Sequence, residues 1–290
     1  MAVAAGGYER MLAPAKLNLC LTVTGRRDDG YHLLDSVVVF TGFGDRLTIR
    51  PANSCDGADI LDIAGPFAAD IENGPDNICL RAIRKYREAG GVIGALSMTL
   101  DKQIPVGAGL GGGSSDAAAV LRYLDRNAHH RPDRDSLAAL ALALGADVPV
   151  CLGGTAQHMT GIGEQLHPLD PAPHGHVVLA RPGVSLSTIA VFREFARRAK
   201  MENRVDKVAL TTHELHRIIQ RGNDLTSAAI RLCPEIGDLM DRMAQCDGAS
   251  AVQMSGSGSA CFALFDDVGL ASAAAAHLAD QGYWAVATGF

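Results

Sequence analysis

The sequence predicts an α+β fold of two domains, in which mixed sheets pack with helices. The chain has 290 residues, which is about two average domains and leaves room for two hydrophobic cores. Its content of 48% hydrophobic and 20% charged residues is that of an ordinary globular protein. Segments with strand-like alternation are interspersed with segments in which apolar residues recur at helical spacing.

The first half of the chain is predicted to open as a sheet. Residues 17–24 alternate apolar and polar side chains, and residues 26–30 form a polar turn. The other elements predicted here are strands at 33–40, 47–49 and 96–100 and helices at 77–89 and 136–144. The last of these helices has Asp135 or Ser136 as its N-cap, and Gly145 ends it.

The second half repeats this mixture of strands and helices. Its predicted strands cover residues 177–180, 251–254 and 260–265, and its predicted helices cover 191–201, 225–232, 236–246 and 269–281. The glycines between residues 153 and 163 mark the expected join between the halves. We therefore expect an N-terminal domain at 1–156 and a C-terminal domain at 157–290.

Charge and cysteine usage narrow the class of protein. The net charge of −6 gives no basic surface for nucleic acid or for a membrane, and no run of 18 or more apolar residues occurs. The seven cysteines form no C-x-x-C pair, and their odd number fits reduced thiols that serve as small core residues. We expect a cytoplasmic protein with neither a nucleic-acid nor a membrane partner.

The segment from Gly107 to Leu124 carries the clearest functional signal. Six of the seven residues from Gly107 to Gly113 are glycine or alanine, so that the backbone can approach a ligand closely. Ser114, Ser115 and Asp116 then read as the start of a helix. The free N–H groups and the macrodipole of a helix start bind phosphate, whereas the simpler alternative is a tightly packed glycine turn.

Several familiar sites are excluded by what surrounds this and other motifs. Although the spacing G-x-G-x-x-G is present, no strand directly precedes it, and no acidic residue ends a second strand about 20 residues further on. The lysine of a P-loop is missing after Gly113. His213 and His216 are three residues apart, which is not the H-E-x-x-H spacing of a zinc site, and no G-x-S-x-G occurs.

Four segments resemble one family in the same order along the chain. The string PVGAGLGGGSSDA resembles the ATP-binding loop of the galactokinase, homoserine kinase, mevalonate kinase and phosphomevalonate kinase (GHMP) superfamily. The segments 13–40, GADVPVCL from Gly145 and MSGSGSACFALF from Met254 are similar to the branch that phosphorylates 4-diphosphocytidyl-2-C-methyl-D-erythritol. The resemblance implies a two-domain GHMP kinase fold with the active site in the cleft between the domains.

The resemblance also implies a catalytic pair. Asp147 follows the end of a helix in Gly-Ala-Asp-Val-Pro, where the family carries its catalytic aspartate, while its local alternative is a capping or turn residue. Lys16 begins a strand of apolar neighbours and is either a solvated edge charge or a residue of the site. Phosphoryl transfer needs charge neutralisation and an oriented acceptor, so we expect Asp147 to orient the hydroxyl and act as a modest general base.

The expected cofactors are ATP and Mg²⁺. By resemblance, the nucleotide-binding residues lie in the glycine segment and around it; they are Asn77, Ile78, Lys102, Pro105, Gly107, Gly109, Leu110, Gly111, Gly112, Gly113, Ser114 and Ser115. A serine hydroxyl at a helix start points toward the same ligand as the free N–H groups, so Ser114 or Ser115, with Ser115 preferred, is the expected Mg²⁺ ligand. No dedicated metal cage is expected.

The substrate is expected to be a small molecule, a cytidine diphosphate sugar alcohol. By resemblance, Tyr31 and His32 contact the cytosine with Phe192 on the opposite side, although a Tyr-His pair can simply close a hairpin. Asn18 and Thr188 are expected at the methylerythritol or ribose end, and Gly256, Ser257 and Gly258 offer N–H groups to the diphosphate or form a plain turn.

The resulting prediction is an ATP-dependent kinase for the 2-hydroxyl of that substrate in the non-mevalonate isoprenoid precursor pathway, active as a monomer or weak homodimer. A mevalonate-type kinase is the alternative within the superfamily, and it should lack a cytosine clamp. A non-catalytic nucleotide-binding regulator is the alternative from another class, and it should have lost Asp147 or Lys16, both of which are present.

Overall fold

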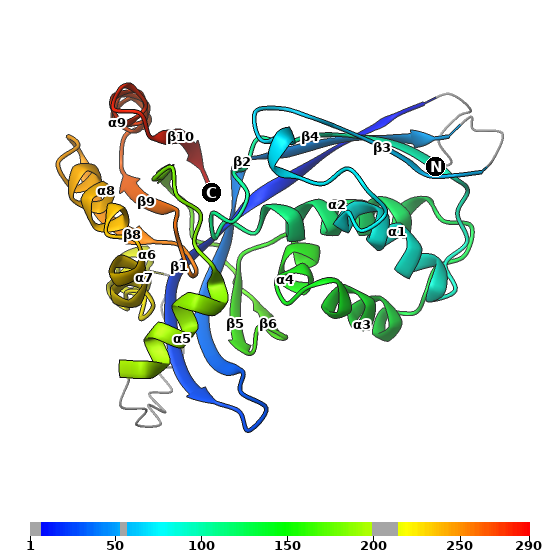
Figure 1. The fold of residues 1–290 in the computed structure, drawn as a ribbon, viewed down its shortest axis with the longest axis horizontal. Helices are drawn as coiled ribbons and strands as arrows, with labels where there is room; N and C mark the ends of the chain where they lie inside the picture. The colour runs from blue at the N-terminus through cyan, green and yellow to red at the C-terminus, as the bar shows by residue number, and fades with distance from the viewer. Residues whose placement is uncertain (1–6, 53–56, 199–213) are drawn as a thin grey trace. The chain divides into compact units, whose positions relative to one another are not determined.

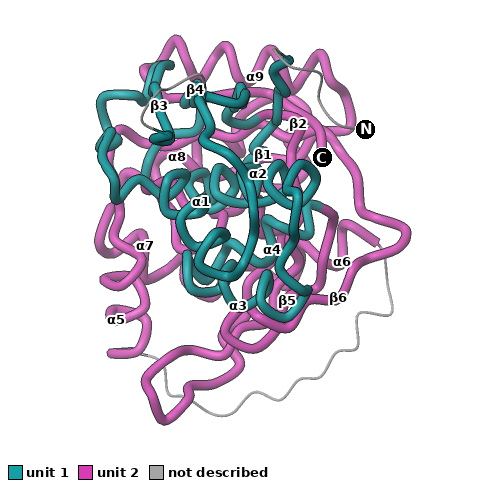
Figure 2. Tube along the Cα trace, turned by 90° about the vertical axis from the view of Figure 1, so that its right-hand side faces the viewer, with its two compact units in different colours: residues 1–15, 44–106, 111–154 teal, residues 16–43, 107–110, 155–290 magenta. Residues whose placement is uncertain are grey.

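The computed structural model describes residues 7–52, 57–198 and 214–290, which divide into two compact units (Figures 1 and 2). Unit 1 contains residues 1–15, 44–106 and 111–154, and unit 2 contains residues 16–43, 107–110 and 155–290. The chain therefore passes between the units several times. The expected folding domains, 1–156 and 157–290, stay a prediction, although the last passage, between Gly154 and Thr155, falls within the predicted join.

Unit 1 builds its core from one face of a mixed sheet. Strand β2 (His32–Pro51) pairs antiparallel with β4 (Leu96–Asp101), β3 (Ile60–Ala64) pairs parallel with β4, and β1 (Glu9–Arg26) pairs with β2. Alternation places Leu47, Ile49, Met98 and Leu100 in the core. The residues between them along the strands are more exposed, so this sheet has one buried and one solvated face.

Four helices lie on the buried side of this sheet (Figure 1). They are α1 (Ile78–Glu88), α2 (Gly112–Asn127), α3 (Arg134–Leu144) and α4 (Val148–Gly153), and a short 3₁₀ helix, Ala68–Asp70, precedes α1. Helices α1 and α2 lie next to the sheet, and α3 and α4 pack on them from beyond (Figure 1). Asn77 caps α1 by accepting from Cys79 N at 3.0 Å. For α3 the predicted cap was wrong, because Asp133 accepts from Ser136 N at 2.7 Å.

Unit 2 is organised around a four-stranded antiparallel sheet in the order β10-β7-β9-β8. Its strands are β7 (His176–Arg181), β8 (Ala249–Met254), β9 (Cys261–Phe265) and β10 (Trp284–Gly289). Every residue of β9 is buried, which explains its continuous run of apolar letters. Helices α8 (Glu235–Ala244) and α9 (Val268–Asp280) pack against this sheet (Figure 1).

The remaining elements of unit 2 flank its two strand systems. The hairpin β5 (Gln157–Gly161) and β6 (Gln165–Pro168) adds to the first half of β2, with Val38 opposite Gln157. The other helices are α5 (Thr188–Arg198), α6 (Leu215–Gln220) and α7 (Thr226–Leu232). No helix within the described ranges is long and apolar enough to span a membrane.

The predicted α+β class is confirmed, with differences in detail. The predicted strands 33–40 and 47–49 form one continuous strand, β2, because residues 41–46 between them also stay in extended conformation. Strands β3, β5, β6 and β10 and helices α4 and α6 were not predicted. Five of the seven cysteines are buried as expected, Cys246 is half-buried, and Cys55 and His213 lie outside the described residues.

Candidate active site

The first half of the glycine segment is anchored to two other parts of unit 2. Lys16 N donates to Leu110 O at 2.8 Å, and Ala260 N donates to Ala108 O at 2.9 Å. Gly109 has φ +77°, and a Cβ there would lie 2.6 Å from Gly258 O. Only glycine fits where two backbones approach this closely, so residue 109 is glycine for a packing reason.

The second half of the segment opens α2 in unit 1. Gly111 is the N-cap with φ +66°, and the first helical bond runs from Ser115 N to Gly111 O at 2.8 Å. The preceding N–H groups of the first turn therefore have no intrahelical acceptor. The helix begins earlier than predicted, because the left-handed glycine makes the cap and places Ser114, Ser115 and Asp116 inside the helix.

A buried charge cluster lies beneath the start of α2. Lys102 is 2% exposed, and its Nζ binds the carboxylates of Asp45 and Asp116, the latter at 2.8 Å. The other oxygen of Asp45 accepts from Gln103 N at 2.6 Å and from Ile104 N at 2.7 Å. The cluster therefore joins β2, the segment after β4 and α2.

Two carboxylates share one ammonium in this cluster, and the pKa values respond to that imbalance. Burial and the neighbouring Asp45 raise the pKa of Asp116 to about 8, against the lowering effect of Lys102. Burial by itself would lower the pKa of Lys102, but Asp116 and Asp45 raise it. Lys102 is thus a paired, buried cation, and its role in binding nucleotide stays a prediction.

Ser115 offers an unusual hydroxyl near the same place. Its side chain is fully buried, and its Oγ has no hydrogen-bond partner, as is also true of Oδ1 of Asp116. Orphaned buried oxygens are rare in folded proteins, and they fit a role in holding a cation or phosphate oxygen. Among the described residues no cluster of three or more His, Cys, Asp or Glu side chains could hold a metal by itself.

Lys16 belongs to a buried polar chain in unit 2. It is 4% exposed, which excludes the alternative of a solvated edge charge, and its Nζ donates to Asn18 Oδ1 at 2.8 Å. Asn18 in turn donates from Nδ2 to Ser36 Oγ at 2.8 Å. Strand β1 therefore places the two predicted residues on the same face, two positions apart.

The glycine turn after β8 packs beside this chain. A Cβ on Gly256 would lie 3.3 Å from Asn18 Oδ1 and 4.0 Å from Lys16 Nζ. Asn223, just before α7, donates from Nδ2 to Met254 O and to Gly256 O, each at 2.8 Å, which fixes the turn.

Two further predicted substrate residues meet at the same turn. The hydroxyls of Thr188 and Ser257 are 2.8 Å apart. The structure thus gathers Lys16, Asn18, Thr188 and the turn at 256–258 within one unit.

The predicted aromatic residues lie at a hairpin and on α5. Tyr31 closes the hairpin through its carbonyl, which accepts from Arg27 N at 2.8 Å, and its side chain is 61% exposed. His32 stacks directly on Phe192, with ring centroids 5.0 Å apart. Two rings at this centroid distance are in direct contact, so a cytosine ring does not fit between His32 and Phe192 in this structure.

The electrostatics of His32 suit hydrogen bonding by a neutral imidazole. Burial, and then Arg26, lower its pKa below 6.5. Its Nε2 is buried and has no hydrogen-bond partner.

Other predicted residues occupy helix starts. Asp147 stands at the N-cap position of α4, yet its carboxylate makes no capping bond to that helix, so the alternative of a capping aspartate is not what the geometry shows. Asn77 uses its side chain to cap α1, with Ile78 following as the first helical residue, and Pro105 is buried. The involvement of these residues in ligand binding stays a prediction.

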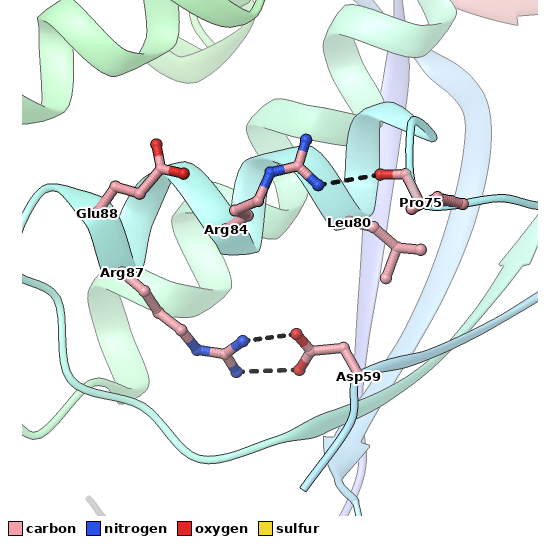
Figure 3. Close-up of a pocket in the computed structure, with 6 residues that line it drawn as sticks. All are labelled: Asp59, Pro75, Leu80, Arg84, Arg87 and Glu88. Atoms are coloured by element: carbon pink, nitrogen blue, oxygen red, sulfur yellow. Dashed lines mark hydrogen bonds and ion pairs between the residues drawn. The ribbon is translucent and has the colours of Figure 1, made fainter.

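A surface pocket on α1 is separate from all of these residues (Figure 3). Two of its charges cancel, because Arg87 binds both oxygens of Asp59, at 2.6 and 3.0 Å, while Arg84 donates to Pro75 O at 3.2 Å. None of the predicted site residues lines it; the lining residues are Asp59, Pro75, Leu80, Arg84, Arg87 and Glu88. The pocket and the candidate site therefore share no residues.

Comparison with known families decides the class of protein. The family described as the GHMP kinases N terminal domain matches residues 77–155, and the GHMP kinases C terminal family matches residues 195–283. The chain belongs to the GHMP kinases. A GHMP kinase is an ATP-dependent small-molecule kinase, and the glycine segment and α2 lie within the residues that match the N-terminal family.

Individual relatives extend over nearly the whole chain. A protein of Paracoccus denitrificans named 4-diphosphocytidyl-2-C-methyl-D-erythritol kinase is 45% identical over 97% of each chain. One of the same name from Parvibaculum lavamentivorans is 42% identical over 94% of each. A crystal structure of 4-(cytidine 5′-diphospho)-2C-methyl-D-erythritol kinase has a TM-score of 0.78 at 37% identity, covering 97% of this GHMP kinase and 98% of that chain.

More distant structures agree on the fold alone. A mevalonate kinase from Methanococcus jannaschii has a TM-score of 0.62 at 12% identity, over 98% of this chain and 99% of that one. The likeness confirms the predicted GHMP kinase fold.

Several residues near the candidate site were not predicted from the sequence. Asp45 and Ser36 lie within β2 among strand-forming residues. Asp45 has no motif around it, and nothing within the segment 13–40 distinguishes Ser36 from its neighbours. Phe195 contacts His32 edge-on, with centroids 6.2 Å apart, and its spacing of three residues from Phe192 on a helix was the available signal. Asn223 follows a glycine in Arg-Gly-Asn-Asp, which reads only as a turn.

Proposed function

We propose that this GHMP kinase transfers the γ-phosphoryl group of ATP to the 2-hydroxyl of 4-diphosphocytidyl-2-C-methyl-D-erythritol, in the non-mevalonate pathway to isoprenoid precursors. Full-length relatives at 41–45% identity carry the name of that kinase. The observation that carries the proposal is the grouping of Lys16, Asn18, Thr188 and the glycine turn within unit 2.

The nucleotide is held by the glycine segment and α2. The free N–H groups of the first turn and the positive end of the helix dipole receive phosphate oxygens. Gly113 is exposed and a Cβ there would meet nothing within 4 Å, which leaves open space beside those N–H groups. Ser115, or Ser114, would hold Mg²⁺, and the ion supplies neutralisation of the phosphate charge when it is bound with ATP.

Lys16 and Asp147 have complementary tasks. The ammonium of Lys16 neutralises negative charge at the transferring phosphoryl group and lowers the pKa of the acceptor hydroxyl. The carboxylate of Asp147 orients that hydroxyl and accepts its proton late, after the oxygen has begun to bond to phosphorus. Catalysis then depends mainly on positioning and charge.

The cytidine is recognised at the aromatic cluster of unit 2. The unpartnered Nε2 of His32 is available to the polar edge of cytosine, and the exposed ring of Tyr31 is available to stack on its face. Phe192 supports the imidazole from behind in this arrangement. Asn18 and Thr188 face the sugar-alcohol or ribose end, and N–H groups of the turn at 256–258 face the diphosphate.

An assay of ADP release with a panel of acceptors tests the proposal. The cytidyl substrate, its uridyl analogue and mevalonate are each supplied with ATP and Mg²⁺. Turnover with the cytidyl substrate alone supports the proposal. Preferred phosphorylation of mevalonate would identify a mevalonate-type kinase instead. ATP binding without phosphorylation of any acceptor would indicate a nucleotide-binding regulator.

A further inference from the structure

We propose that Ser36 is a positioning residue for phosphoryl transfer, because it sets the orientation of the Asn18 amide that faces Lys16. This inference rests on the proposed function, in which Lys16 acts at the transferring group. Ser36 lies on β2, is fully buried, and is two hydrogen bonds away from the Lys16 ammonium.

The proton of the Ser36 hydroxyl has a defined place. Ser36 Oγ lies 2.6 Å from Cys20 O, and a carbonyl oxygen can only accept, so the hydroxyl donates its one proton there. Toward Asn18, at 2.8 Å, Ser36 can therefore only accept. The amide atom of Asn18 that faces Ser36 must be the nitrogen.

The other end of the same amide then faces Lys16. Asn18 Oδ1 lies 2.8 Å from Lys16 Nζ, which has protons to donate and no lone pair when charged. Turning the amide over would set its NH₂ group against the ammonium and its oxygen against a hydroxyl oxygen whose proton is already used. Only one orientation satisfies both neighbours, and Ser36 determines it from the side away from the ammonium.

Burial makes this determination effective. The exposures of Lys16, Asn18 and Ser36 are 4%, 1% and 0%, so water does not replace a lost partner. The backbone of Asn18 is also fixed, because its N–H donates to Ser255 Oγ at 3.2 Å. What remains variable is the side-chain amide, and Ser36 removes that freedom.

The decisive experiment is a double-mutant cycle of Ser36→Ala with Asn18→Ala, measured as kcat and as KM for ATP. Ser36→Ala alone is expected to lower kcat by about 10- to 100-fold, as misplacement of a site group does, with KM for ATP within threefold. In the Asn18→Ala protein the same change is expected to cost less than threefold, because the amide that Ser36 orients is gone. Equal losses in both backgrounds, or no loss in the first, would overturn the proposal.

Two variants separate positioning from general stability. Ser36→Thr keeps the hydroxyl and should restore kcat to within threefold of wild type, whereas Ser36→Cys, a weaker donor of similar shape, should not. If Ser36→Ala fails to fold, this pair decides, and equal kcat values for Thr and Cys would contradict the proposal. Thr41→Val is the matched control, since Thr41 is also buried on β2 and donates to Phe43 O at 2.8 Å. It should lose stability and keep kcat.

A measurement without turnover keeps this inference distinct from the proposed function. The side-chain amide signal of Asn18 in a ¹H–¹⁵N spectrum is assigned by its loss in Asn18→Ala. It is expected to shift in Ser36→Ala and to return in Ser36→Thr, and an unchanged signal in Ser36→Ala would overturn the proposal. If the wild-type enzyme prefers another acceptor, the proposed substrate is wrong, and the cycle is measured with that acceptor.

Discussion

Replacing Lys102 by methionine is expected to destabilise the folded protein, because it removes the cation of the buried charge cluster under α2. The side chain of Lys102 contacts two carboxylates that are themselves buried, and no other cation is bonded to either of them among the described residues. Methionine fills a similar volume but leaves the two carboxyl groups in a dry site without the ammonium that binds them both. Breaking a buried ion pair in this way destabilises a protein by about 3–5 kcal/mol.

That loss converts to a large shift in melting temperature. For a domain of 150–250 residues each kcal/mol moves Tm by about 2–4 °C, so Lys102→Met is expected to melt about 6–20 °C below wild type. Lys85→Met is the matched control on the protein surface. Lys85 is 3.7 Å from Glu88 on α1 and is partly exposed, and such a pair contributes at most about 0.5 kcal/mol.

The pH dependence of the defect has a definite sign. The pKa of Asp116 in the folded protein is raised to about 8, above its unfolded value, so the folded protein binds a proton that the unfolded chain lacks. Stability from this group is present below the unfolded pKa and is lost as pH rises toward 8. Without Lys102 the carboxyl pKa rises further, so Lys102→Met should be closer to wild type at pH 5.5 than at pH 8.5.

Thermal and urea unfolding at both pH values measure this prediction. Nucleotide titration adds a functional readout, because Lys102 Nζ lies 3.0 Å from where a Cβ on Gly112 would be, and its loss should weaken ATP binding as the start of α2 relaxes. A Tm within 3 °C of wild type at pH 8.5, or a defect that grows toward acid, would refute the electrostatic reasoning.

Three other changes address the site directly. Asp147→Asn is isosteric and should lower kcat by about 10²–10⁴-fold with little change in KM, and a kcat near that of wild type would make Asp147 a bystander. Gly113→Ala should leave Tm unchanged or slightly higher and raise the KM for ATP, as nucleotide titration beside a thermal melt would show. Wild type should reject the uridyl analogue, and His32→Ala should relax that cytidine-over-uridine ratio of kcat/KM, because a site built around one hydrogen-bond edge discriminates strongly against the reversed edge. Equal kcat/KM values of the wild-type enzyme for the cytidyl substrate and the uridyl analogue would contradict the proposal that His32 recognises the cytosine.

The fold class and most helices could be predicted because their signals are local. α1 and α9 begin at side chains that cap them, Asn77 and Asp267, and each shows apolar residues at helical spacing. Strand β9 is buried throughout, so its continuous run of apolar residues is enough to predict it. In contrast, β3 and β10 are short and half-exposed, and what makes them strands is pairing with β4 and β7 rather than their own composition.

The candidate site likewise contains residues that local sequence patterns indicate and residues that they do not. The glycine segment, Lys16 and Asp147 could be predicted as site residues because motifs surround them, and their roles stay predictions. Asp45, Ser36 and Asn223 could not be found, because each acts through a partner far along the chain: Asp45 on Lys102, Ser36 on Asn18 and Asn223 on Gly256. Such residues carry meaning only once strands have brought distant segments together, and a single sequence gives no sign of that proximity.

The structure shows why individual positions of the glycine segment lack a side chain, which the sequence alone does not show. Gly109 is required by the close approach of Gly258 O, Gly111 is favoured by its left-handed cap, and a Cβ on Gly112 would make a tight contact of 3.0 Å with Lys102 Nζ. Gly113 has none of these reasons, since it is exposed, its φ is ordinary and a Cβ there would meet nothing. Alanine would even favour the helix at that position. No contact among the described residues explains the missing side chain at Gly113, whereas the proposed approach of the ATP phosphates to this position would explain it.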